Sequence, residues 1–590
     1  MSSVRPRSSG RHTRILGAVL ALVVVVSGCA AIPTTSQPNP VPQEGGGQAT
    51  QEVPEPEQGL DPLSVVRQFV RASARPANDH AAARAYLSEA ARERWQPDDS
   101  LTVIRNEFGT VYLGEEESPD PENHRVVSLR ASELGRLTSD SAFVSVSGDF
   151  EAPVRVGRQP NGEWRIVDAP GTVLITESDF SESYFEVPVY FFSPDSSVPV
   201  PDPRYVVARP RSGLPARVVD LVLGGPSNGL AGAVVNPLGE SAELDSNVDT
   251  ARDGALVVPL TGITEESEKL RERMAVQVVR SLQHVTTSRI RLLSDGVALV
   301  PGTLDWRPGD LPAYESITSP SSELPGLMTT EAGRIRSLDT GAPVQGPLGR
   351  GVYDVESAAQ SINGQQLAVV EDLGDRGHRL RVGDYGSPGR VVDLSAERLT
   401  RPTWRPPSSN ESKSSELWTV RDGKSIVRVQ RGPDGSWVPQ PVTVSELPDE
   451  GAITALRLSR DGTRAALVVN GTLWVASVVR TSSEVSLRSP RALKSDILTS
   501  AVDVDWSSQD TLVVATSSEW RPVVRVSVDG FEHDTFNSSN LGPPTEAITA
   551  APGRQIVVAD THGLWTAGEV GAVWVPHPHS RPGAEPFYPG

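Results

Sequence analysis

The spacing of apolar residues changes along this chain, and the first apolar segment lies close to the amino terminus. Residues 15–26 form an uninterrupted apolar run. A membrane-spanning helix needs about 20 such residues, whereas a shorter run is typical of the hydrophobic region of a secretory signal peptide. The run follows a basic stretch without acidic residues that contains Arg5, Arg7, Arg11 and Arg14. We therefore predict a signal peptide over residues 1–28.

Residues 29–60 show no regular spacing of apolar positions. They are rich in proline, glycine, glutamine and glutamate and contain few large apolar side chains. A segment of this composition does not bury enough apolar surface to fold. We interpret it as a tether that holds the globular part of the protein away from the membrane.

Residues 61–182 begin with a helical period and continue with strand-like alternation. Apolar residues at 63, 65, 66, 69 and 70 have near-helical spacing. Asn78 and Asp79 are candidates to cap a second helix that continues through residues 80–95. Strand-like runs follow, and Asn161-Gly162 is a hairpin signal because both residues tolerate positive φ. Helices before antiparallel strands predict an α+β domain. This order resembles that of NTF2-like cones, and because no convergent polar set is visible we interpret the domain as a scaffold.

Residues 183–315 predict an α/β domain with two helices. Leu270, Met274, Val278 and Leu282 repeat every four residues in the longer helix. Strands are expected at residues 187–192, 205–211, 254–263 and 288–299, and the shorter helix ends at Gly224-Gly225-Pro226. The ordered segments "LVLGGPSNGL", "LVVPLTG", "QVVRSLQHV" and "RIRLLSDG" resemble the GerMN domain, a module named from germination and sporulation proteins that also occurs in envelope lipoproteins.

One segment of this domain imitates a catalytic motif. Residues 225–229 read G-P-S-N-G and match the G-x-S-x-G pattern of a nucleophile elbow around Ser227. That motif requires a sharp turn from a strand into a helix, with acid and histidine partners downstream. Here a helical pattern precedes the serine, and the first histidine downstream, His284, lies in an amphipathic helix. We interpret the segment as a turn.

Short strands replace helical periodicity from residue 320 to residue 590. Related turn-and-strand units begin near residues 361, 405, 459, 507 and 551, and Leu-Trp recurs at 417–418, 473–474 and 564–565. A repeat of about 40–50 residues with four short strands is typical of a β-propeller blade. An earlier unit around "GLMTTEAGRIRSLD" adds a blade, so we predict five to six or more blades, with a split closing blade as one arrangement. The Leu-Trp pairs are interpreted as blade packing.

Composition and charge reduce the number of function classes that this protein could belong to. The formal net charge is −19, which disfavours nucleic-acid binding because that depends on Lys and Arg at the phosphates. His577 and His579 are two potential metal ligands without a third, so we predict no metal site. Asp503 and Asp505 alternate along one strand and therefore face one side; solvation or turn capping is the favoured interpretation. No phosphate-binding glycine loop or zinc pattern is present, and we predict no catalytic residues.

Cys29 is the only cysteine of the chain and directly follows the predicted signal peptide. Val26-Ser27-Gly28-Cys29 resembles the lipobox of bacterial lipoproteins. The resemblance implies that the Cys29 thiol carries diacylglycerol through a thioether bond and that the chain is cleaved before Cys29. It leaves open whether the new amino terminus also receives an N-palmitoyl chain. Several acyl chains hold a protein at a membrane far better than one, since each buried methylene contributes about 0.8 kcal/mol.

The chain resembles the LpqB family of actinobacterial lipoproteins in the order of its parts, which are a signal peptide, a lipobox, a tether, an α+β domain, a GerMN-like domain and a degenerate propeller. The resemblance implies a non-enzymatic envelope protein, lipid-anchored on the extracellular side of the cell membrane, that acts with the MtrA–MtrB two-component system. It would bind the extracellular domain of the sensor histidine kinase MtrB and modulate phosphorylation of MtrA, with effects on envelope homeostasis and division. No cofactor is implied beyond the covalent lipid.

Two other classes of function stay open at this point. An enzyme or a carbohydrate-binding propeller acting on the cell wall would need carboxylates or aromatic residues gathered on one face of the propeller. A purely structural wall spacer would need neither. Sequence alone does not locate the residues of the propeller's central channel, so it does not separate these classes.

Replacing Cys29 by alanine should abolish labelling of the protein with palmitate and should release or misprocess it, because the acceptor sulfur is lost. Metabolic labelling followed by membrane fractionation measures both effects. Since the chain has no other cysteine, no second thiol can take up the label, and unchanged labelling would contradict the lipobox.

Overall fold

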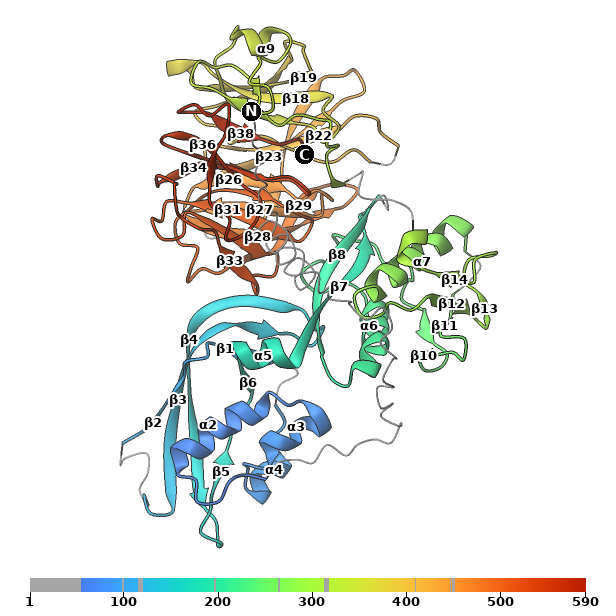
Figure 1. Cartoon of the computed structure of the whole chain (residues 1–590), viewed down its shortest axis with the longest axis vertical. Coiled ribbons are helices and arrows are strands. Elements are labelled where there is room, and N and C mark those ends of the chain that lie inside the picture. The colour runs from blue at the N-terminus through green and yellow to red at the C-terminus, as the bar shows by residue number, and fades with distance from the viewer. Residues whose placement is uncertain are drawn as a thin grey trace, which may run out of the picture. The chain divides into compact units, whose positions relative to one another are not determined.

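The computed structural model describes residues 55–97, 100–114, 120–195, 198–263, 266–311, 318–408, 410–445, 447 and 451–590. The predicted signal peptide and the predicted tether up to residue 54 lie outside this part of the chain. The predicted fold class is confirmed, with two mixed domains and an all-β propeller (Figure 1). The resemblance of the first domain to NTF2-like cones stays a prediction.

The first domain packs helices against one mostly antiparallel sheet. Its elements are α2 (Pro62–Ser73), α3 (Ala77–Arg84), α4 (Glu89–Arg94), β1 (Leu101–Ile104), β2 (Gly109–Tyr112), β3 (His124–Leu137), β4 (Phe143–Arg158), β5 (Trp164–Asp168), β6 (Val173–Thr176) and α5 (Glu177–Ser183). The strand order is β5-β4-β3-β1-β6, with β2 also on β3 and with β1 parallel to β6. The Asp61 carboxylate caps α2 by accepting from the N–H groups of Leu63 and Ser64. The apolar face of α2 is buried in the core of the domain.

The second helix predicted for this domain is wrong in two respects. Asn78 and Asp79 do not cap it, because they lie inside α3 and Pro76 is its N-cap residue. The helix is also divided into α3 and α4. Leu87 forms a bridge with Ile166 of β5, and the Ile166 carbonyl accepts from the N–H of Ser88. Ser88 then caps α4 through its hydroxyl, which accepts from the N–H of Ala91. A tertiary contact with the sheet thus interrupts a segment whose local propensity is helical.

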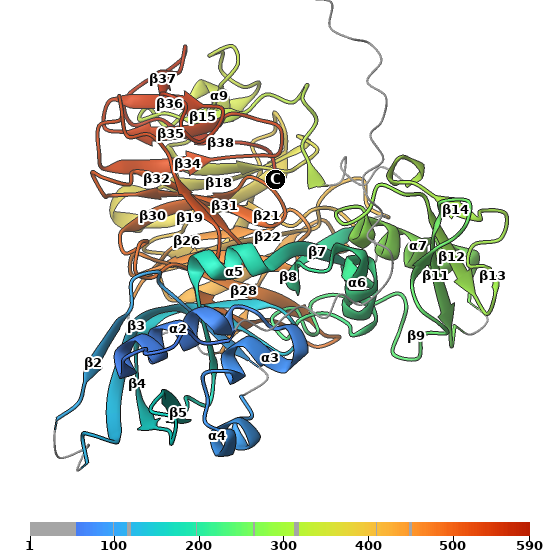
Figure 2. The same ribbon diagram turned by 60° about the horizontal axis from the view of Figure 1, so that its bottom comes forward.

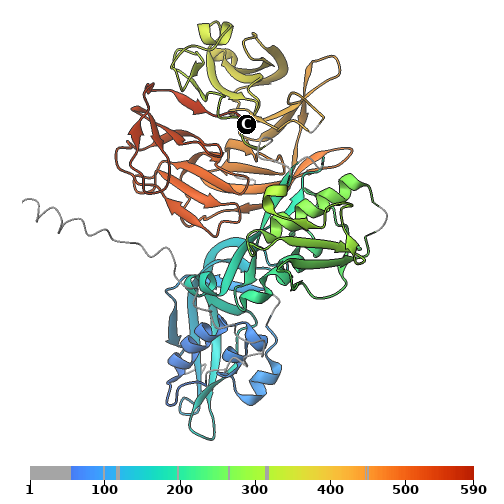
Figure 3. The same ribbon diagram turned by 45° about the vertical axis from the view of Figure 1, so that its right-hand side comes forward.

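The second domain contains a two-stranded ribbon, a small sheet and two helices. Its elements are β7 (Tyr184–Phe192), β8 (Pro199–Val207), α6 (Leu214–Leu223), β9 (Glu243–Leu244), β10 (Asp249–Thr250), β11 (Leu256–Thr261), α7 (Glu268–Leu282), β12 (Ile290–Ser294), β13 (Val297–Ala298) and β14 (Asp305–Trp306). β11 and β12 are parallel and are joined through α7, as in a βαβ unit. α6 and α7 pack against the β7–β8 ribbon through the core of the domain (Figure 3).

Three prolines lie in β8, although it pairs with β7 along its whole length. Successive N–H groups of a strand point to opposite edges, and proline has no N–H. Pro199, Pro201 and Pro203 occupy every second position, so all three missing N–H groups lie on the outer edge of β8, away from β7. Tyr205 has the same parity, and its N–H donates away from β7 to the carbonyl of Ser141 (2.8 Å). The sequence predicted this strand only from Tyr205 onward, because the prolines concealed its beginning.

Six sheets in the described residues form the propeller. Blade I is β16 (Arg336–Ser337), β15 (Leu327–Thr329) and β38 (Glu585–Phe587); blade II is β17 (Val355–Gln360), β18 (Gln366–Asp372), β19 (His378–Asp384) and β20 (Arg390–Ala396); blade III is β21 (Thr403–Trp404), β22 (Glu416–Arg421), β23 (Ser425–Arg431) and β24 (Trp437–Pro441); blade IV is β26 (Ile453–Leu458), β27 (Arg464–Val469), β28 (Thr472–Arg480) and β29 (Val485–Ala492) with β25 (Thr443–Val444); blade V is β30 (Ala501–Trp506), β31 (Thr511–Thr516), β32 (Val523–Ser527) and β33 (His533–Thr535); blade VI is β34 (Thr545–Thr549), β35 (Ile556–Asp560), β36 (Gly563–Ala567) and β37 (Val575–Pro576).

Blade I is built from both ends of the propeller sequence. β38, near the carboxyl terminus, pairs with β15 (Figure 2). In this pairing Phe587 lies opposite Leu327. The inner strands β38, β17, β21, β26, β30 and β34 contact one another in this order around the ring. The split closing blade is therefore present, and the number of blades lies within the predicted range.

Tryptophans at the ends of two inner strands connect neighbouring blades. The indole N–H of Trp404 donates to the carbonyl of Ala359 in blade II (3.1 Å), and that of Trp506 donates to the carbonyl of Arg457 in blade IV (3.2 Å). Both rings are buried. The Leu-Trp pairs also pack within blades, with Leu417, Leu473 and Leu564 fully buried.

Replacing Phe587 by alanine should loosen blade I, because Phe587 is buried among the apolar residues of β15 and β17. Removal of a buried phenylalanine side chain costs about 3–5 kcal/mol. Hydrogen exchange in peptides covering residues 327–337 should become faster, a local measure that suits a multidomain chain. Val573→Ala is the control, since Val573 is half exposed. Equal exchange in the two variants would contradict closure through β38.

Candidate interaction sites

The lipidation site predicted from the sequence, Cys29 with Val26, Ser27 and Gly28, lies outside the described residues. It therefore stays a prediction. In the described part of the chain, no helix is both long and apolar enough to cross a membrane.

A network of arginines and aspartates lies on the axis of the propeller. The guanidinium of Arg457 lies 3.2 Å from the Asp503 carboxylate, and that of Arg401 lies 3.7 Å from both Asp503 and Asp505. The N–H of Ile548 in blade VI also donates to Asp503 (3.1 Å). Burial, with the nearby Arg401, lowers the pKa of Arg457 to about 10. The network thus connects blades III to VI through charge-assisted hydrogen bonds and ion pairs.

The interpretation of Asp503 and Asp505 as solvated or turn-capping residues is wrong. Both carboxylates are buried, and Asp505 accepts hydrogen bonds from the Thr549 hydroxyl and the Ala550 N–H. Both aspartates do face one side of the strand, as their alternation predicts, but that side faces the propeller axis. Arg401 and Arg457 were not singled out from the sequence, because nothing local distinguishes them from surface arginines.

Arg460 closes one end of the axis. Its side chain is buried and donates to the carbonyls of Ala550 (2.7 Å), Pro589 (2.9 Å) and Trp506 (3.3 Å). The neighbouring Gly590 donates its N–H to the carbonyl of Gln360 (2.9 Å). The turns that follow the inner strands lie at this end of the axis, and the carboxyl-terminal residues lie across it.

A cavity of about 290 Å³ lies at the other end of the axis; we call it the mouth cavity. Residues from all six inner strands or the segments just before them line it, among them Glu356, Thr454, Glu546 and Glu585. Burial raises the pKa of Glu585 to about 7, with Asp503 and Glu356 adding to the rise and the nearby arginines opposing it. Glu356 pairs with His378 (3.0 Å). The cavity is therefore rich in carboxylates.

The β7–β8 ribbon contacts the end of the propeller that holds Arg460. The Arg464 guanidinium donates to the carbonyl of Pro201 (2.6 Å), and the Gln509 amide donates to that of Pro199 (3.0 Å). Asp195 pairs with Arg405 (3.2 Å). Each of these propeller residues lies in or beside a turn that follows an inner strand, so the contacts gather at one end of the axis.

Four aromatic rings connect the first domain, the ribbon and the propeller. Phe143, Phe180 and Tyr205 surround Phe531 of blade V, with ring centroids 5.0 to 5.6 Å from that of Phe531. The Tyr205 hydroxyl donates to the Asp529 carboxylate (2.8 Å). Edge-to-face aromatic pairs of this kind contribute about 0.5–1.5 kcal/mol beyond their buried area.

A glutamate beside this cluster has an unusual environment. Glu186 in β7 lies near Asp529, Glu532 and Asp510 of blade V, and burial raises its pKa to about 8, with these three carboxylates adding to the rise. The contact between ribbon and propeller therefore holds a protonated carboxyl group at neutral pH.

Ser227 is not arranged as a nucleophile, in agreement with its interpretation as a turn residue. Its hydroxyl donates to Asp202 (2.8 Å), which also accepts from the Ser227 N–H. Asp202 in turn pairs with the buried Arg204 (2.7 Å). His577 accepts from the N–H of His579, and among the described residues no group of His, Cys, Asp and Glu side chains could hold a metal ion.

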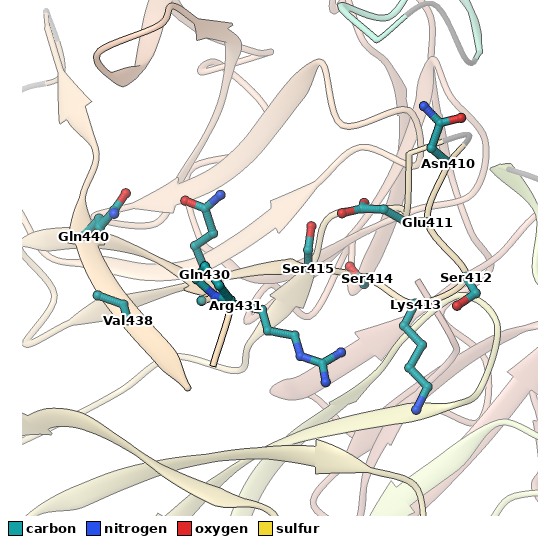
Figure 4. Close-up of a pocket in the computed structure, with 12 residues that line it drawn as sticks. Asn410, Glu411, Ser412, Lys413, Ser414, Ser415, Gln430, Arg431, Val438 and Gln440 are labelled. Carbon is teal, nitrogen blue, oxygen red and sulfur yellow. The ribbon is translucent and has the colours of Figure 1, made fainter. Parts of the chain in front are cut away.

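A second cavity, of about 760 Å³, lies beside β23 and β24 (Figure 4). Residues 410–415 line one side, and Gln430, Arg431 and Gln440 line the other. Glu411 accepts from the hydroxyl and the N–H of Ser408. None of its described lining residues is aromatic, so it offers no ring on which a sugar could stack.

The fold defines the class of this protein, which combines two mixed domains with a six-bladed propeller. Comparisons with known families agree. Residues 333–589 match the family described as "Lipoprotein LpqB beta-propeller domain", residues 55–181 match "Lipoprotein LpqB, N-terminal domain", and residues 188–300 match "Sporulation and spore germination".

Full-length relatives identify the family. A protein named Lipoprotein LpqB from Rhodococcus jostii is 31% identical over 585 residues, covering 95% of this chain and 94% of its own. The protein of the same name from Mycolicibacterium smegmatis is 31% identical over 597 residues, covering 97% and 99%. The chain belongs to the LpqB family of lipoproteins. Among solved structures, a functionally unknown protein from Desulfotomaculum acetoxidans covers 40% of this chain and 76% of its own at 11% identity, with a TM-score of 0.30.

Glu186→Gln should make the protein more stable than the wild type at pH 8 and equally stable at pH 4. The unfolded chain loses the Glu186 proton near the ordinary glutamate pKa, about 4.3, whereas the folded chain keeps it to about pH 8. The contribution of Glu186 to stability is therefore complete below pH 4 and is lost as the pH rises through 8. Thermal unfolding across this range measures the difference.

The exposed Glu107 provides the control, because Glu107→Gln makes the same chemical change at a solvent-accessible position. A difference between Glu186→Gln and wild type that does not vary with pH would show that the Glu186 proton is not retained on folding.

Proposed function

We propose that this protein is a lipid-anchored extracytoplasmic protein that binds the extracellular domain of an MtrB-like sensor histidine kinase and modulates its phosphorylation of the response regulator. Effects on envelope homeostasis and division would follow. The observation that carries the proposal is membership of the LpqB family over nearly the whole chain, with the domains in the same order. The anchor would be the diacylglycerol on Cys29, which leaves every later residue on the outer side of the membrane.

We further propose that the protein acts by docking and has no catalytic step of its own. The charged groups on the propeller axis, Arg401, Arg457, Asp503 and Asp505, are engaged with one another and with backbone groups. Ser227 is held by Asp202. These contacts are typical of residues that stabilise a fold, because a reacting group needs access to its substrate.

A docking surface is best supported near the mouth cavity. Trp520, in the loop between β31 and β32, is 85% exposed. The ends of this loop lie beside the beginnings of two inner strands, since Ser517 donates to the carbonyl of Ser500 and the Thr545 hydroxyl donates to that of Pro522. Tryptophan is enriched among residues that dominate binding energy at protein interfaces.

Crosslinking in intact cells, followed by affinity capture of the full-length protein, should recover a histidine kinase. Trp520→Ala should lower the recovered amount severalfold, because a central aromatic anchor is worth about 2 kcal/mol or more. Val573→Ala, in the loop before β37, should leave recovery unchanged. Capture of glycan fragments alone would favour a wall-binding propeller and would contradict the kinase as partner.

A further inference from the structure

One segment of the second domain contacts three other parts of the chain. Residues 225–235 lie between α6 and β9 and include the G-P-S-N-G pattern; we call this segment the strap. Its hydrogen-bond partners lie in the first domain, in the β7–β8 ribbon and in blade IV. The pattern that imitates a nucleophile elbow therefore lies at a junction between domains.

The ribbon holds the beginning of the strap through two buried side chains of β8. Asp202 accepts from the N–H and from the hydroxyl of Ser227, both at 2.8 Å. Arg204, which pairs with Asp202, donates to the carbonyl of Gly225 (3.0 Å). A buried ion pair is stable only when its remaining polar atoms are hydrogen-bonded. The strap therefore completes the bonding of this pair.

The first domain reaches the strap through the turn between β3 and β4. The Asp140 carboxylate in this turn accepts from the N–H of Asn228 (2.9 Å). The Asp140 carbonyl accepts from the guanidinium of Arg204. The next carbonyl, that of Ser141, accepts from the N–H of Tyr205 (2.8 Å). A single turn of the first domain thus bonds to both the strap and the ribbon.

Blade IV holds the middle of the strap. The hydroxyl of Ser477 in β28 donates to the carbonyl of Gly229. Leu230 is buried in a small apolar cluster with Val200 of β8, and Val479 of β28 packs against this cluster. The strap therefore has both a polar and an apolar contact with the blade.

Two glycines near the ends of the strap give its backbone freedom to turn. Gly225 and Gly232 have φ values of 83° and 76°, a conformation that other residues adopt only with strain. They flank the segment that bonds to Asp202, Asp140 and Ser477. Changes of φ and ψ at such positions are typical of hinges.

The strap is one of several contacts between the first domain and the propeller. The aromatic cluster around Phe531 and the ion pair of Arg105 with Asp496 also join them. Domains joined by contacts that are largely polar move relative to one another unless specific bonds prevent it. The strap supplies bonds of this kind, because it is held by all three parts at once.

We propose that the strap is a lock, which holds the first domain and blade IV to the ribbon, and that the first domain and the propeller separate when the strap is released. Such a lock would fix the distance between the propeller and the domain that follows the predicted tether. This role goes beyond the proposed kinase interaction and does not depend on it.

Pulsed electron spin resonance on the full chain in detergent measures the separation. Spin labels are attached to the exposed positions Asp149→Cys in the first domain and Ser482→Cys in blade IV. A Cys29→Ala background leaves no other thiol to react. The unaltered strap should give one narrow distribution of distances. Leu230→Ala combined with Ser477→Ala should broaden it toward longer distances, because both contacts of the strap with blade IV are then weakened.

Ser477→Ala alone provides a milder variant that tests the lock even if the double variant does not fold. Hydrogen exchange in peptides covering residues 225–235 should become about fivefold faster, the factor that corresponds to the net contribution of one hydrogen bond. Thermal unfolding verifies that each variant is folded.

The matched control is Leu304→Ala combined with Ser212→Ala, which makes the same chemical changes at exposed positions of the second domain. It should reproduce the narrow distribution. A folded strap variant with the same distribution as this control, or unchanged exchange in Ser477→Ala, overturns the lock, since other contacts would then hold the domains together. None of these measurements involves the kinase, so their failure leaves the proposed kinase interaction unaffected.

Discussion

The pairing of β15 with β38 is the constraint on which the rest of the propeller depends. It joins two strands from opposite ends of the propeller sequence and turns a row of sheets into a closed ring. Closure leaves only short, protected edges and sets the six inner strands around one axis. Arg460, the arginine–aspartate network and the mouth cavity follow one another along that axis, and their arrangement requires the ring to be closed.

Closure also explains how buried charges are tolerated. Removing Arg457 and Asp503 from water costs several kcal/mol for each ion, and their attraction offsets this only when the remaining polar atoms are hydrogen-bonded. Backbone groups of blades I, III, IV and VI supply most of those bonds in the network. Arg457 Nε is an exception, because it is buried without a hydrogen-bond partner among the described residues.

The β7–β8 ribbon connects the domains because its two edges have different chemistry. One edge of β8 pairs with β7. The other edge carries the prolines, and its carbonyls accept hydrogen bonds from Arg464 and Gln509. On the same edge the Tyr205 N–H donates to the carbonyl of Ser141. Arg204 of the ribbon also donates to the carbonyl of Gly225, which follows α6. The proline spacing that conceals the strand in the sequence is thus the feature that prepares it for contacts with the propeller.

Local patterns in the sequence predicted the signal peptide and lipobox motif, which stay predictions. They also determined the fold class, the repeated turn-and-strand units that begin near residues 361, 405, 459, 507 and 551, and the dismissal of Ser227 as a nucleophile. These features depend on residues close together in the chain, such as Asp461-Gly462 turns and alternating apolar positions. Only the tertiary structure divided the helix at Leu87, extended β8 through its prolines and turned Asp503 and Asp505 inward. The reason is that alternation shows which residues share a face, but what that face meets is decided by strands and blades distant in sequence, brought together by closure of the ring.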